Sequence, residues 1–423
     1  MDKPADGTRP RVVIVGGGFG GMEAAKGLSK AKVDITLIDR QNHHTFQPLL
    51  YQVATAALSP ADVAWPIRAI LRGQANARVV LAEVDAIDLE ARCVTASGHR
   101  FAYDVLVLAT GATHAYFGHD DWAAFAPGLK RIEDATDIRR RILMAFERAE
   151  LSDDPTERRA LTTFVLVGGG PTGVEMAGAI AEVALHALPD DFRNVDPKDA
   201  RILLVEAGPR ILPAFPEACS AYAKRVLQKM GVDVFTDSRV VGIDARGVDL
   251  EDRRIDAGCV VWAAGVAASP AARWLGAAHD RAGRVEVTAD LALPGRPEVY
   301  VIGDTAALTR PDGRPVPGIA PAAKQMGQYV AKAIAAKASG RLPPGPFRYR
   351  HQGDLATVGR QAAIVHLDRL TLTGFIGWLF WGLVHVYFLI GLRDRIAVAF
   401  NWLWDYVTFG RHARLITDVA PDR

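Results

Sequence analysis

Two glycine-rich turns constrain the fold of this chain more than any other feature of its sequence. Each turn follows a short β-branched run, at 12–15 and at 164–167, and each opens a helical stretch. In a βαβ unit that binds a dinucleotide, the first glycine makes the turn, the second admits the pyrophosphate and the third lets the helix pack on the sheet. The sequence therefore predicts two dinucleotide sites. Their glycines are Gly16, Gly18 and Gly21 in the first copy and Gly168, Gly170 and Gly173 in the second.

An acidic residue ends the strand that follows each turn. Asp39 ends the first of these strands, and Glu206 follows the second. A carboxylate at this position accepts hydrogen bonds from ribose hydroxyls and repels a 2′-phosphate. Glu206 therefore favours NADH over NADPH, although the guanidinium of nearby Arg210 could attract a phosphate.

Charge and cysteine content exclude several classes of function. The 50 basic and 48 acidic residues give a net charge of +2, and no basic run is interleaved with aromatics, so nucleic-acid binding is not expected. Cys93, Cys219 and Cys259 lie far apart. No redox-active pair is available for disulfide reduction, and no metal site is expected. The polar start of the chain, 1–9, has no apolar signal segment, which makes the cytoplasm the expected compartment.

Three later strands close on a glycine. They end at Gly111, Gly265 and Gly303. Gly303 and Asp304 resemble the second FAD-binding fingerprint of the pyridine nucleotide-disulfide reductase superfamily, which implies that Asp304 contacts the ribityl chain. The Ala109-Thr110-Gly111 segment is similar to another element of that superfamily. Each could be an ordinary strand end, but their order along the chain favours FAD at one of the two turns, with Thr110, Gly111, Asp304 and Gly265 among the cofactor-binding residues.

Longer segments narrow the resemblance to one family. Residues 42–54 resemble the hallmark segment of type II NADH:quinone oxidoreductases, 168–175 are similar to the NADH-binding turn of that family, and 355–404 resemble its membrane-associating region. The likeness spans about 10–416. It implies non-covalent FAD, NADH as donor, a membrane quinone that takes two electrons without proton pumping, and a homodimer.

The same resemblance suggests catalytic residues. Glu175 falls on the glutamate that lies near flavin and nicotinamide in the family, although by position alone it would be an ordinary carboxylate in the first turn of a helix. Gln47, in the hallmark segment, is a second candidate.

The quinone motif of the family, roughly A-Q-x-A-x-Q, reads Ala-Pro-Ala-Ala-Lys-Gln here, at 320–325. Gln325 keeps the second glutamine. Pro321 replaces the first and can donate neither a side-chain nor a backbone hydrogen bond. Lys324 could supply a charge or simply be a solvated helix residue.

The C-terminal region is apolar. The run 371–392 carries no formal charge and fits three interpretations: a helix that spans a membrane, a buried core or dimer helix, or a helix in the membrane interface. The following stretch, 396–409, is an amphipathic helix in which Asn401, Asp405 and Thr408 are polar. Beyond it, Arg411, His412 and Arg414 could meet anionic lipids. The family resemblance favours a monotopic protein on the cytoplasmic face of the cell membrane.

The expected fold is therefore α/β, with two Rossmann-like domains and a C-terminal membrane-associating helical region. The predicted domains are 9–115 with 295–340 for FAD, 116–294 for NADH, and 341–423 with amphipathic anchoring helices. An NAD(P)H-dependent ferredoxin-type reductase would share both nucleotide sites but would not need the tryptophan-rich tail. A sulfide:quinone oxidoreductase would need catalytic cysteines. A non-catalytic NADH-sensing flavoprotein would reduce its flavin but turn over poorly.

Overall fold

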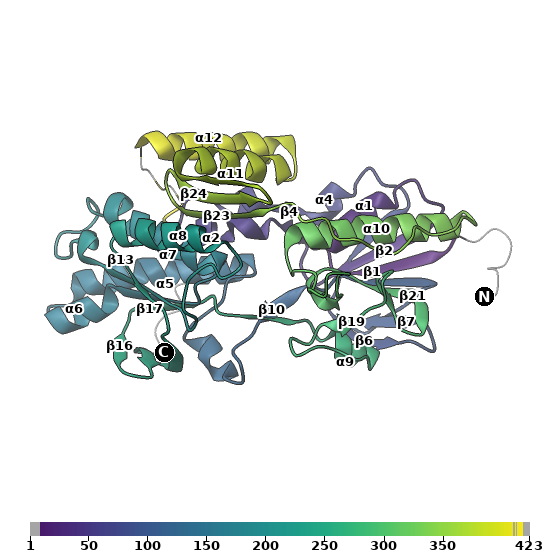
Figure 1. Ribbon diagram of the computed structural model, residues 1–423, viewed down its shortest axis with the longest axis horizontal. Helices are drawn as coiled ribbons and strands as arrows, with labels where there is room; N and C mark the ends of the chain where they lie inside the picture. The colour runs from purple at the N-terminus through teal and green to yellow at the C-terminus, as the bar shows by residue number, and fades with distance from the viewer. Residues whose placement is uncertain (1–8, 409–410, 412, 418–423) are drawn as a thin grey trace. The chain divides into compact units, whose positions relative to one another are not determined.

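The computed structural model describes residues 9–408, 411 and 413–417 (Figure 1). Packing divides the chain into two compact units, and each is described by itself. The first unit comprises the chain up to Thr45, Ala64–Thr113 and Val266–Gln352, and the second comprises Phe46–Val63, His114–Gly265 and the chain from Gly353 on. These units are defined by packing alone, and the nucleotide-binding ranges expected from the sequence stay predictions.

The first unit is built on a six-stranded sheet in the order β20-β21-β9-β1-β2-β5. The strand β1 lies inside the sheet and pairs in parallel with both β2 and β9, which explains its β-branched, two-sided hydrophobic sequence. Only β20, at one edge, runs antiparallel to its neighbour. The strands are β1 (Arg11–Val15), β2 (Asp34–Asp39), β5 (Ala77–Leu81), β9 (Val105–Leu108), β20 (Ala292–Leu293) and β21 (Arg296–Val301).

Two layers cover this sheet. Val12 and Ile14 point into a core shared with helices α1 and α10, whereas Val13 and Val15 point into a second core beneath a small antiparallel sheet. This alternation follows from the two-residue period of a strand. The covering elements are α1 (Phe19–Gly27), α10 (Ala320–Ala338), β6 (Val84–Asp88), β7 (Cys93–Ala96), β8 (His99–Ala102) and α9 (Ala271–Leu275). Shorter elements are β3 (His43–Thr45), β4 (Ala64–Pro66), α4 (Ile67–Ile70), β18 (Val266–Ala268), β19 (Val285–Glu286), η5 (Gly303–Thr305) and β22 (Ala306–Ala307).

The second unit repeats the pattern around a four-stranded parallel sheet in the order β13-β12-β11-β17. Every residue of β11 is buried, as its apolar sequence predicts. The strands are β11 (Thr163–Val167), β12 (Arg201–Val205), β13 (Val232–Phe235) and β17 (Cys259–Trp262), with an antiparallel sheet of β14 (Val240–Asp244), β15 (Gly247–Leu250) and β16 (Arg254–Asp256). The helices are α2 (Leu50–Ala54), α3 (Pro60–Val63), α5 (Ile132–Leu151), α6 (Pro155–Leu161), α7 (Pro171–Glu182) and α8 (Glu217–Lys229).

The C-terminal region packs into the second unit as an antiparallel sheet followed by two helices (Figure 1). The run 371–392 is not one long helix, because its first residues belong to a strand and the helix α11 has only 15 residues. In the described part of the chain, no helix is both long and apolar enough to cross a membrane. The elements are β23 (Asp354–Gly359), β24 (Ala362–Leu367), β25 (Leu370–Thr373), α11 (Gly374–Phe388) and α12 (Leu392–Thr408).

The helix predicted over 396–409 is confirmed as the main part of α12, except that Phe409 lies outside the described residues.

Helix α7 and strand β23 approach each other closely at Gly178. A Cβ atom at this position would lie 1.8 Å from the carbonyl oxygen of Val358, so any larger residue would force the two elements apart. This contact brings the C-terminal sheet onto the flank of the helix that follows the second glycine turn.

Candidate functional site

The first and third glycines of both turns are required by the backbone. Gly16 and Gly168 have φ angles of +101° and +109°, in the region that only glycine adopts without strain. A Cβ atom on Gly21 would lie 1.8 Å from the carbonyl oxygen of Gly16, and one on Gly173 would lie 1.9 Å from that of Gly168. Both turns therefore fold as the sequence predicts, with each helix seated tightly on its own strand.

The second glycine of each turn faces open space. A Cβ atom on Gly18 or Gly170 would meet no described atom within 4 Å. Both residues precede the first turn of a helix, where unpaired N–H groups and the positive end of the helix dipole favour a phosphate. Each turn is thus a cradle of the right chemistry for a pyrophosphate.

The two acids are held against their turns in the same way. The N–H of Gly17 donates to Asp39 Oδ2 at 2.5 Å, and the N–H of Gly169 donates to Glu206 Oε2 at 2.6 Å. The other oxygen of each carboxylate accepts a second backbone N–H, from Gln41 and from Gly208, at 2.7 Å. Burial raises the pKa of Asp39. Both carboxylates are therefore fixed beside the cradles, where a nucleotide ribose would lie.

The side chain of Arg210 is hydrogen-bonded to its own loop. Its guanidinium donates to the carbonyl oxygens of Phe215 and Pro213, each at 2.8 Å. These bonds hold the guanidinium on the loop after β12, which weakens the case for a bound 2′-phosphate.

Thr110, Gly111 and Asp304 gather near the first turn. The strands β1, β9 and β21 are neighbours in the sheet, and ligands of such sheets bind at the carboxyl ends of the strands. The Thr110 hydroxyl lies 2.5 Å from that of Ser269 and 3.2 Å from that of Thr305, and Thr305 also donates to the carbonyl of Gly111. Gly265 lies in the second unit, where a Cβ would meet the ring of Phe117 at 2.5 Å.

The four catalytic residues suggested by the sequence do not share one unit. Glu175 and Gln47 lie in the second unit, and Gln47 is exposed at the start of η1 (Gln47–Leu49). Lys324 and Gln325 lie on α10 of the first unit, with the Lys324 ammonium 5.6 Å from the centre of the Phe19 ring.

Gln325 is engaged by the backbone at both ends of its amide. Its Nε2 donates to the carbonyl of Arg350, and the N–H of Arg350 donates to its Oε1, both at 2.9 Å. The side chain therefore fastens the segment after α10.

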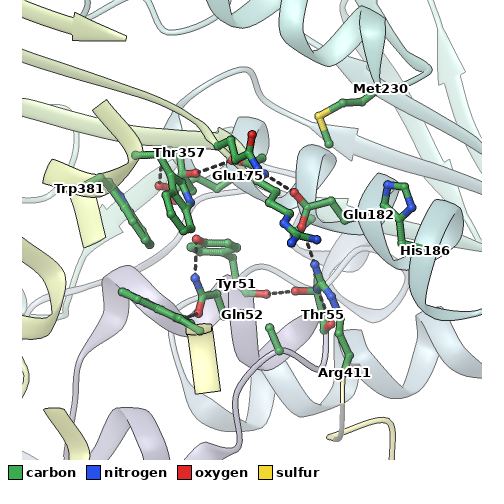
Figure 2. A pocket seen from close by; sticks show the side chains of 17 residues that line it. Tyr51, Gln52, Thr55, Glu175, Glu182, His186, Met230, Thr357, Trp381 and Arg411 are labelled. Carbon is green, nitrogen blue, oxygen red and sulfur yellow. Dashed lines mark hydrogen bonds and ion pairs between the residues drawn. The ribbon is translucent and has the colours of Figure 1, made fainter. Parts of the chain in front are cut away.

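A cavity of about 440 Å³ lies wholly within the second unit (Figure 2). Helix α7 contributes Glu175, Ala179 and Glu182, at the spacing that places side chains on one helix face. The remaining walls come from α2 and the residues after it, the segment after α7, the end of α8, the β23–β24 hairpin, α11, α12 and the segment after α12. These other lining residues are Tyr51, Gln52, Thr55, Ala57, His186, Met230, Thr357, Gly359, Arg360, Gln361, Trp378, Trp381, Trp402 and Arg411.

Glu175 lines this cavity, and its pKa is raised towards neutral pH. It is half-buried, and the N–H of Thr357 donates to its Oε1 across 3.3 Å. Burial raises the pKa of Glu175 to about 8, and this long hydrogen bond offsets only part of the effect. A carboxyl group that titrates near neutral pH can hold and release a proton during turnover.

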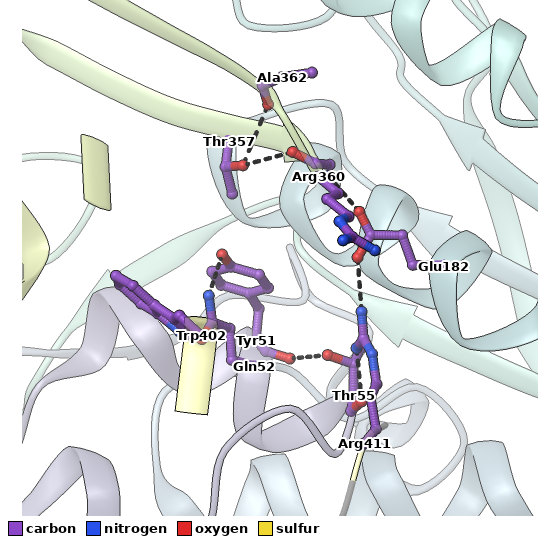
Figure 3. Close-up of polar contacts among 10 residues, drawn as sticks. Tyr51, Gln52, Thr55, Glu182, Thr357, Arg360, Ala362, Trp402 and Arg411 are labelled. Carbon is purple, nitrogen blue, oxygen red and sulfur yellow. Dashed lines mark hydrogen bonds and ion pairs between the residues drawn. The ribbon is translucent and has the colours of Figure 1, made fainter. Parts of the chain in front are cut away.

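Polar side chains at the floor of the cavity are bonded to one another (Figure 3). Gln52 Nε2 donates to the hydroxyl of Tyr51 at 2.8 Å, and Trp402 Nε1 donates to Gln52 Oε1 at 2.7 Å. Arg411 donates to Glu182 Oε2 at 2.7 Å and to the carbonyl of Thr55 at 2.8 Å. No pattern in the sequence predicts a role for Tyr51, Gln52, Thr55 or Glu182, although Tyr51 and Gln52 lie in the hallmark segment.

Both arginines that were predicted to meet anionic lipids have partners within the protein, and their contact with lipid stays a prediction. The guanidinium of Arg411 is bound to Glu182 and mostly buried, and Arg414 donates to the carbonyl of Ala187 and to Asp191. Both side chains therefore fasten the segment after α12 to the second unit. His412, the third of the predicted group, lies outside the described residues.

Comparison with known proteins decides the family. The pyridine nucleotide-disulphide oxidoreductase model matches residues 10–327, and the NDH2 C-terminal domain model matches residues 351–412. The chain is 45% identical over 425 residues to the type II NADH:quinone oxidoreductase Ndh of Mycobacterium tuberculosis, covering 97% of this chain and 91% of that protein. The chain belongs to the type II NADH:quinone oxidoreductase family.

Two further matches agree with this assignment. The type II NADH:quinone oxidoreductase NdhA of Mycobacterium tuberculosis is 44% identical, over 98% of this chain and 90% of that protein. The fold is similar to that of NDH2 from Plasmodium falciparum, solved in complex with NADH, with a TM-score of 0.88 at 20% identity, over 97% of this chain and 100% of that one. The family and the fold class predicted from the sequence are therefore confirmed.

The raised pKa of Glu175 predicts a pH-dependent stability. Because folding raises this pKa from its ordinary 4.5 to about 8, the folded state binds the proton more tightly, and the resulting stabilisation is lost as pH rises from 4.5 through 8. Glu175→Gln stays neutral at every pH. Its melting temperature relative to the parent should therefore rise by several degrees between about pH 6 and about pH 9.

The exposed Glu147 supplies the control for this measurement. Glu147→Gln should leave the difference in melting temperature nearly flat over the same pH range. Equal pH profiles for the two variants would show that Glu175 does not titrate as described.

Proposed function

We propose that this enzyme oxidises NADH through bound FAD and reduces a quinone by two electrons without pumping protons. The observation that carries the proposal is the pair of glycine cradles, each with its own carboxylate, in a chain that belongs to this family over almost its whole length. In the net reaction, NADH loses a hydride, and the quinone gains two electrons and two protons. One of these protons comes from the solvent.

The first cradle fits FAD. Gly18 leaves open space at the start of α1 for a pyrophosphate, Asp39 is fixed beside this turn and is proposed to bind the ribose, and Thr110 and Asp304 follow the neighbouring strands. When bound, FAD supplies the redox chemistry by taking the hydride of NADH and passing its electrons on. The chain holds and orients the cofactor there.

The second cradle fits NADH. Gly170 leaves room for the pyrophosphate at the start of α7, and Glu206 is fixed where it can bind the adenosine ribose. Glu175 lies one turn further along the same helix. We assign to it the holding of a proton near the reacting groups, because burial keeps it largely protonated at neutral pH. Lys324, Gln325 and Gln47 stay candidates from the family motif.

Steady-state turnover tests the function directly. Purified flavin-loaded enzyme should oxidise NADH rapidly when a short-chain quinone is present and slowly when it is absent. A ferredoxin-type reductase would need a protein acceptor, and an NADH sensor would turn over poorly with every acceptor. No quinone-dependent NADH oxidation would overturn the proposal.

Glu206 predicts the nucleotide preference. Glu206→Ser removes the charge that repels a 2′-phosphate, while Arg210 stays bonded to its own loop. The ratio of kcat/KM for NADH to that for NADPH should fall about tenfold, as expected for the loss of one interaction of roughly 1.4 kcal/mol. Glu217→Ser, at an exposed glutamate on α8, should leave the ratio unchanged. An unchanged ratio in the Glu206 variant would mean that this carboxylate does not face the ribose.

The helices α11 and α12 support membrane attachment. Both helices expose large apolar side chains, and such a patch marks a surface that contacts a membrane or another protein. The residues are Phe375, Ile376, Leu379, Leu383, Tyr387 and Phe388 on α11, with Ile396, Phe400, Leu403 and Trp404 on α12. We infer a monotopic enzyme on the cytoplasmic face of the cell membrane, as the family resemblance implies. The homodimer rests on that resemblance alone.

Two leucines of α11 test the attachment. Leu379 and Leu383 are 52% and 71% exposed, so replacing both with serine should spare the core. Burying a leucine in a bilayer contributes roughly 1.5–3 kcal/mol, and the double variant should bind phospholipid vesicles at least about tenfold more weakly. In a sedimentation assay, the control Leu151→Ser, at another exposed leucine, should bind as the parent does. Undiminished binding of the double variant would exclude this surface as the anchor.

A further inference from the structure

We propose that His44 is a positioning residue of the FAD site, because its imidazole holds the carbonyl of Gly17 and thereby directs the N–H of Gly18 towards the pyrophosphate. This inference rests on the proposed function and names a residue outside the glycine turn itself. It is carried by a side-chain hydrogen bond in the first turn and by the backbone hydrogen bond that takes its place in the second.

The hydrogen bond between His44 and Gly17 defines the state of the imidazole. His44 lies on β3 and is 4% exposed, and its Nδ1 lies 2.8 Å from the carbonyl oxygen of Gly17. Because a carbonyl oxygen can only accept, Nδ1 must carry a hydrogen. Burial lowers the pKa of His44 to about 4, so the ring is neutral at physiological pH. The bond therefore requires the neutral tautomer that carries its hydrogen on Nδ1.

This bond also sets the direction of the next backbone N–H. In a planar trans peptide, the carbonyl oxygen and the N–H of the following residue point to opposite sides. With the carbonyl of Gly17 held towards His44, the N–H of Gly18 points away from the imidazole. Gly18 faces open space at the start of α1, where the first N–H groups have no partner within the helix. A fixed N–H at this position is ready for a phosphate oxygen before binding.

The second turn shows the same arrangement with a different donor. The carbonyl of Gly169 accepts the backbone N–H of Leu212 at 2.7 Å, while the Gly169 N–H donates to Glu206. Gly18 and Gly170 share nearly the same conformation, with φ and ψ of −69° and −167° and of −71° and −179°. In both turns, the middle residue is thus held by its acid at the N–H and by a separate donor at the carbonyl.

The backbone donor of the second turn comes from a strained residue. Leu212 has a φ of +50°, which a bulky residue rarely adopts. Such a conformation persists where the surrounding structure enforces it, and it is often found at functional sites. In the first turn, a side chain from β3 supplies the donor instead. Two different donors that meet the same carbonyl indicate that both cradles need this contact.

The imidazole also fills space beside the turn. Phe19, the first residue of α1, packs edge-on against the His44 ring, with 5.1 Å between the centroids and 87° between the planes. A substitution at His44 can therefore act through lost packing as well as through the lost donor. The experiment has to separate the two effects.

The affinity for FAD tests the role of the donor. The flavin-loaded enzyme is diluted, and the FAD that dissociates is measured by its fluorescence. His44→Leu keeps a side chain of similar volume but removes the donor, and it should raise the Kd for FAD about 3- to 10-fold, the effect of one neutral hydrogen bond. His44→Asn places an amide N–H near the position of Nδ1 and should recover most of the lost affinity.

Two controls locate the effect. His99→Leu, at an exposed histidine on β8 of the same unit, should leave the Kd for FAD unchanged. The KM for NADH should stay at the parent value in the flavin-loaded His44 variants, because Leu212 supplies the donor of the second turn. Equal Kd values for FAD in the parent and His44→Leu would overturn the proposal. Equal losses of affinity in His44→Leu and His44→Asn would assign the effect to packing and overturn it as well.

The tautomer of His44 provides a second measurement, made on the parent enzyme. The ¹⁵N NMR spectrum of histidine-labelled, flavin-loaded protein should show His44 as the neutral form with its hydrogen on Nδ1, identified by the signal that disappears in His44→Asn. A hydrogen on Nε2 alone would contradict the proposal, because Nδ1 could not then donate to Gly17. Failure of the proposed function would look different, since the parent would bind FAD but show no quinone-dependent turnover.

Discussion

The close approach of the third glycine of each turn to the carbonyl oxygen of the first sets the geometry from which the rest of the molecule follows. At 1.8 Å and 1.9 Å, the space for a Cβ atom on Gly21 or Gly173 is already taken by backbone. Each helix can therefore lie directly on its sheet and point its N-terminus into open space. This arrangement turns an otherwise apolar βαβ unit into a site for a charged nucleotide.

A second close approach joins the C-terminal sheet to helix α7. Gly178 lets β23 lie against α7, and α11 and α12 follow β23–β25 in the chain. Helix α7, which begins at the second glycine turn, thereby forms one wall of an aromatic cavity, and the apolar C-terminal helices form another. Glu182 holds the segment after α12 through Arg411, so one helix links nucleotide binding, a protonatable carboxyl group and the C-terminal helices. Helix α7 therefore contacts several parts of the second unit at once.

The sequence was sufficient to predict those features that depend on residues close together in the chain. The glycine turns, Asp39, Glu206 and the buried strands were predictable because sterics, helix dipoles and strand periodicity act over a few residues. The family and its FAD, NADH and quinone chemistry were predictable from longer motifs and agree with the relatives. The division of 371–392 into strand and helix was not, because a uniformly apolar run hides the break at Gly374, where φ is +69°.

Contacts between distant residues were also beyond the sequence. The pairing of Arg411 with Glu182, and of Gln325 with Arg350, joins segments whose approach depends on the finished fold. The hydrogen bond from His44 to Gly17 also depends on two segments that meet only in the folded chain. The tryptophan-rich tail predicts a membrane interface, but its sequence does not show which of the tryptophans points into the protein.

An anaerobic spectroscopic titration tests the central claim most directly. The flavin-loaded enzyme is mixed with NADH in the absence of oxygen, and a short-chain quinone is then added in one portion. The account predicts that NADH bleaches the visible absorbance of the flavin and that the quinone restores it within the turnover time. A flavin that NADH does not bleach, or that stays bleached after quinone is added, would contradict it.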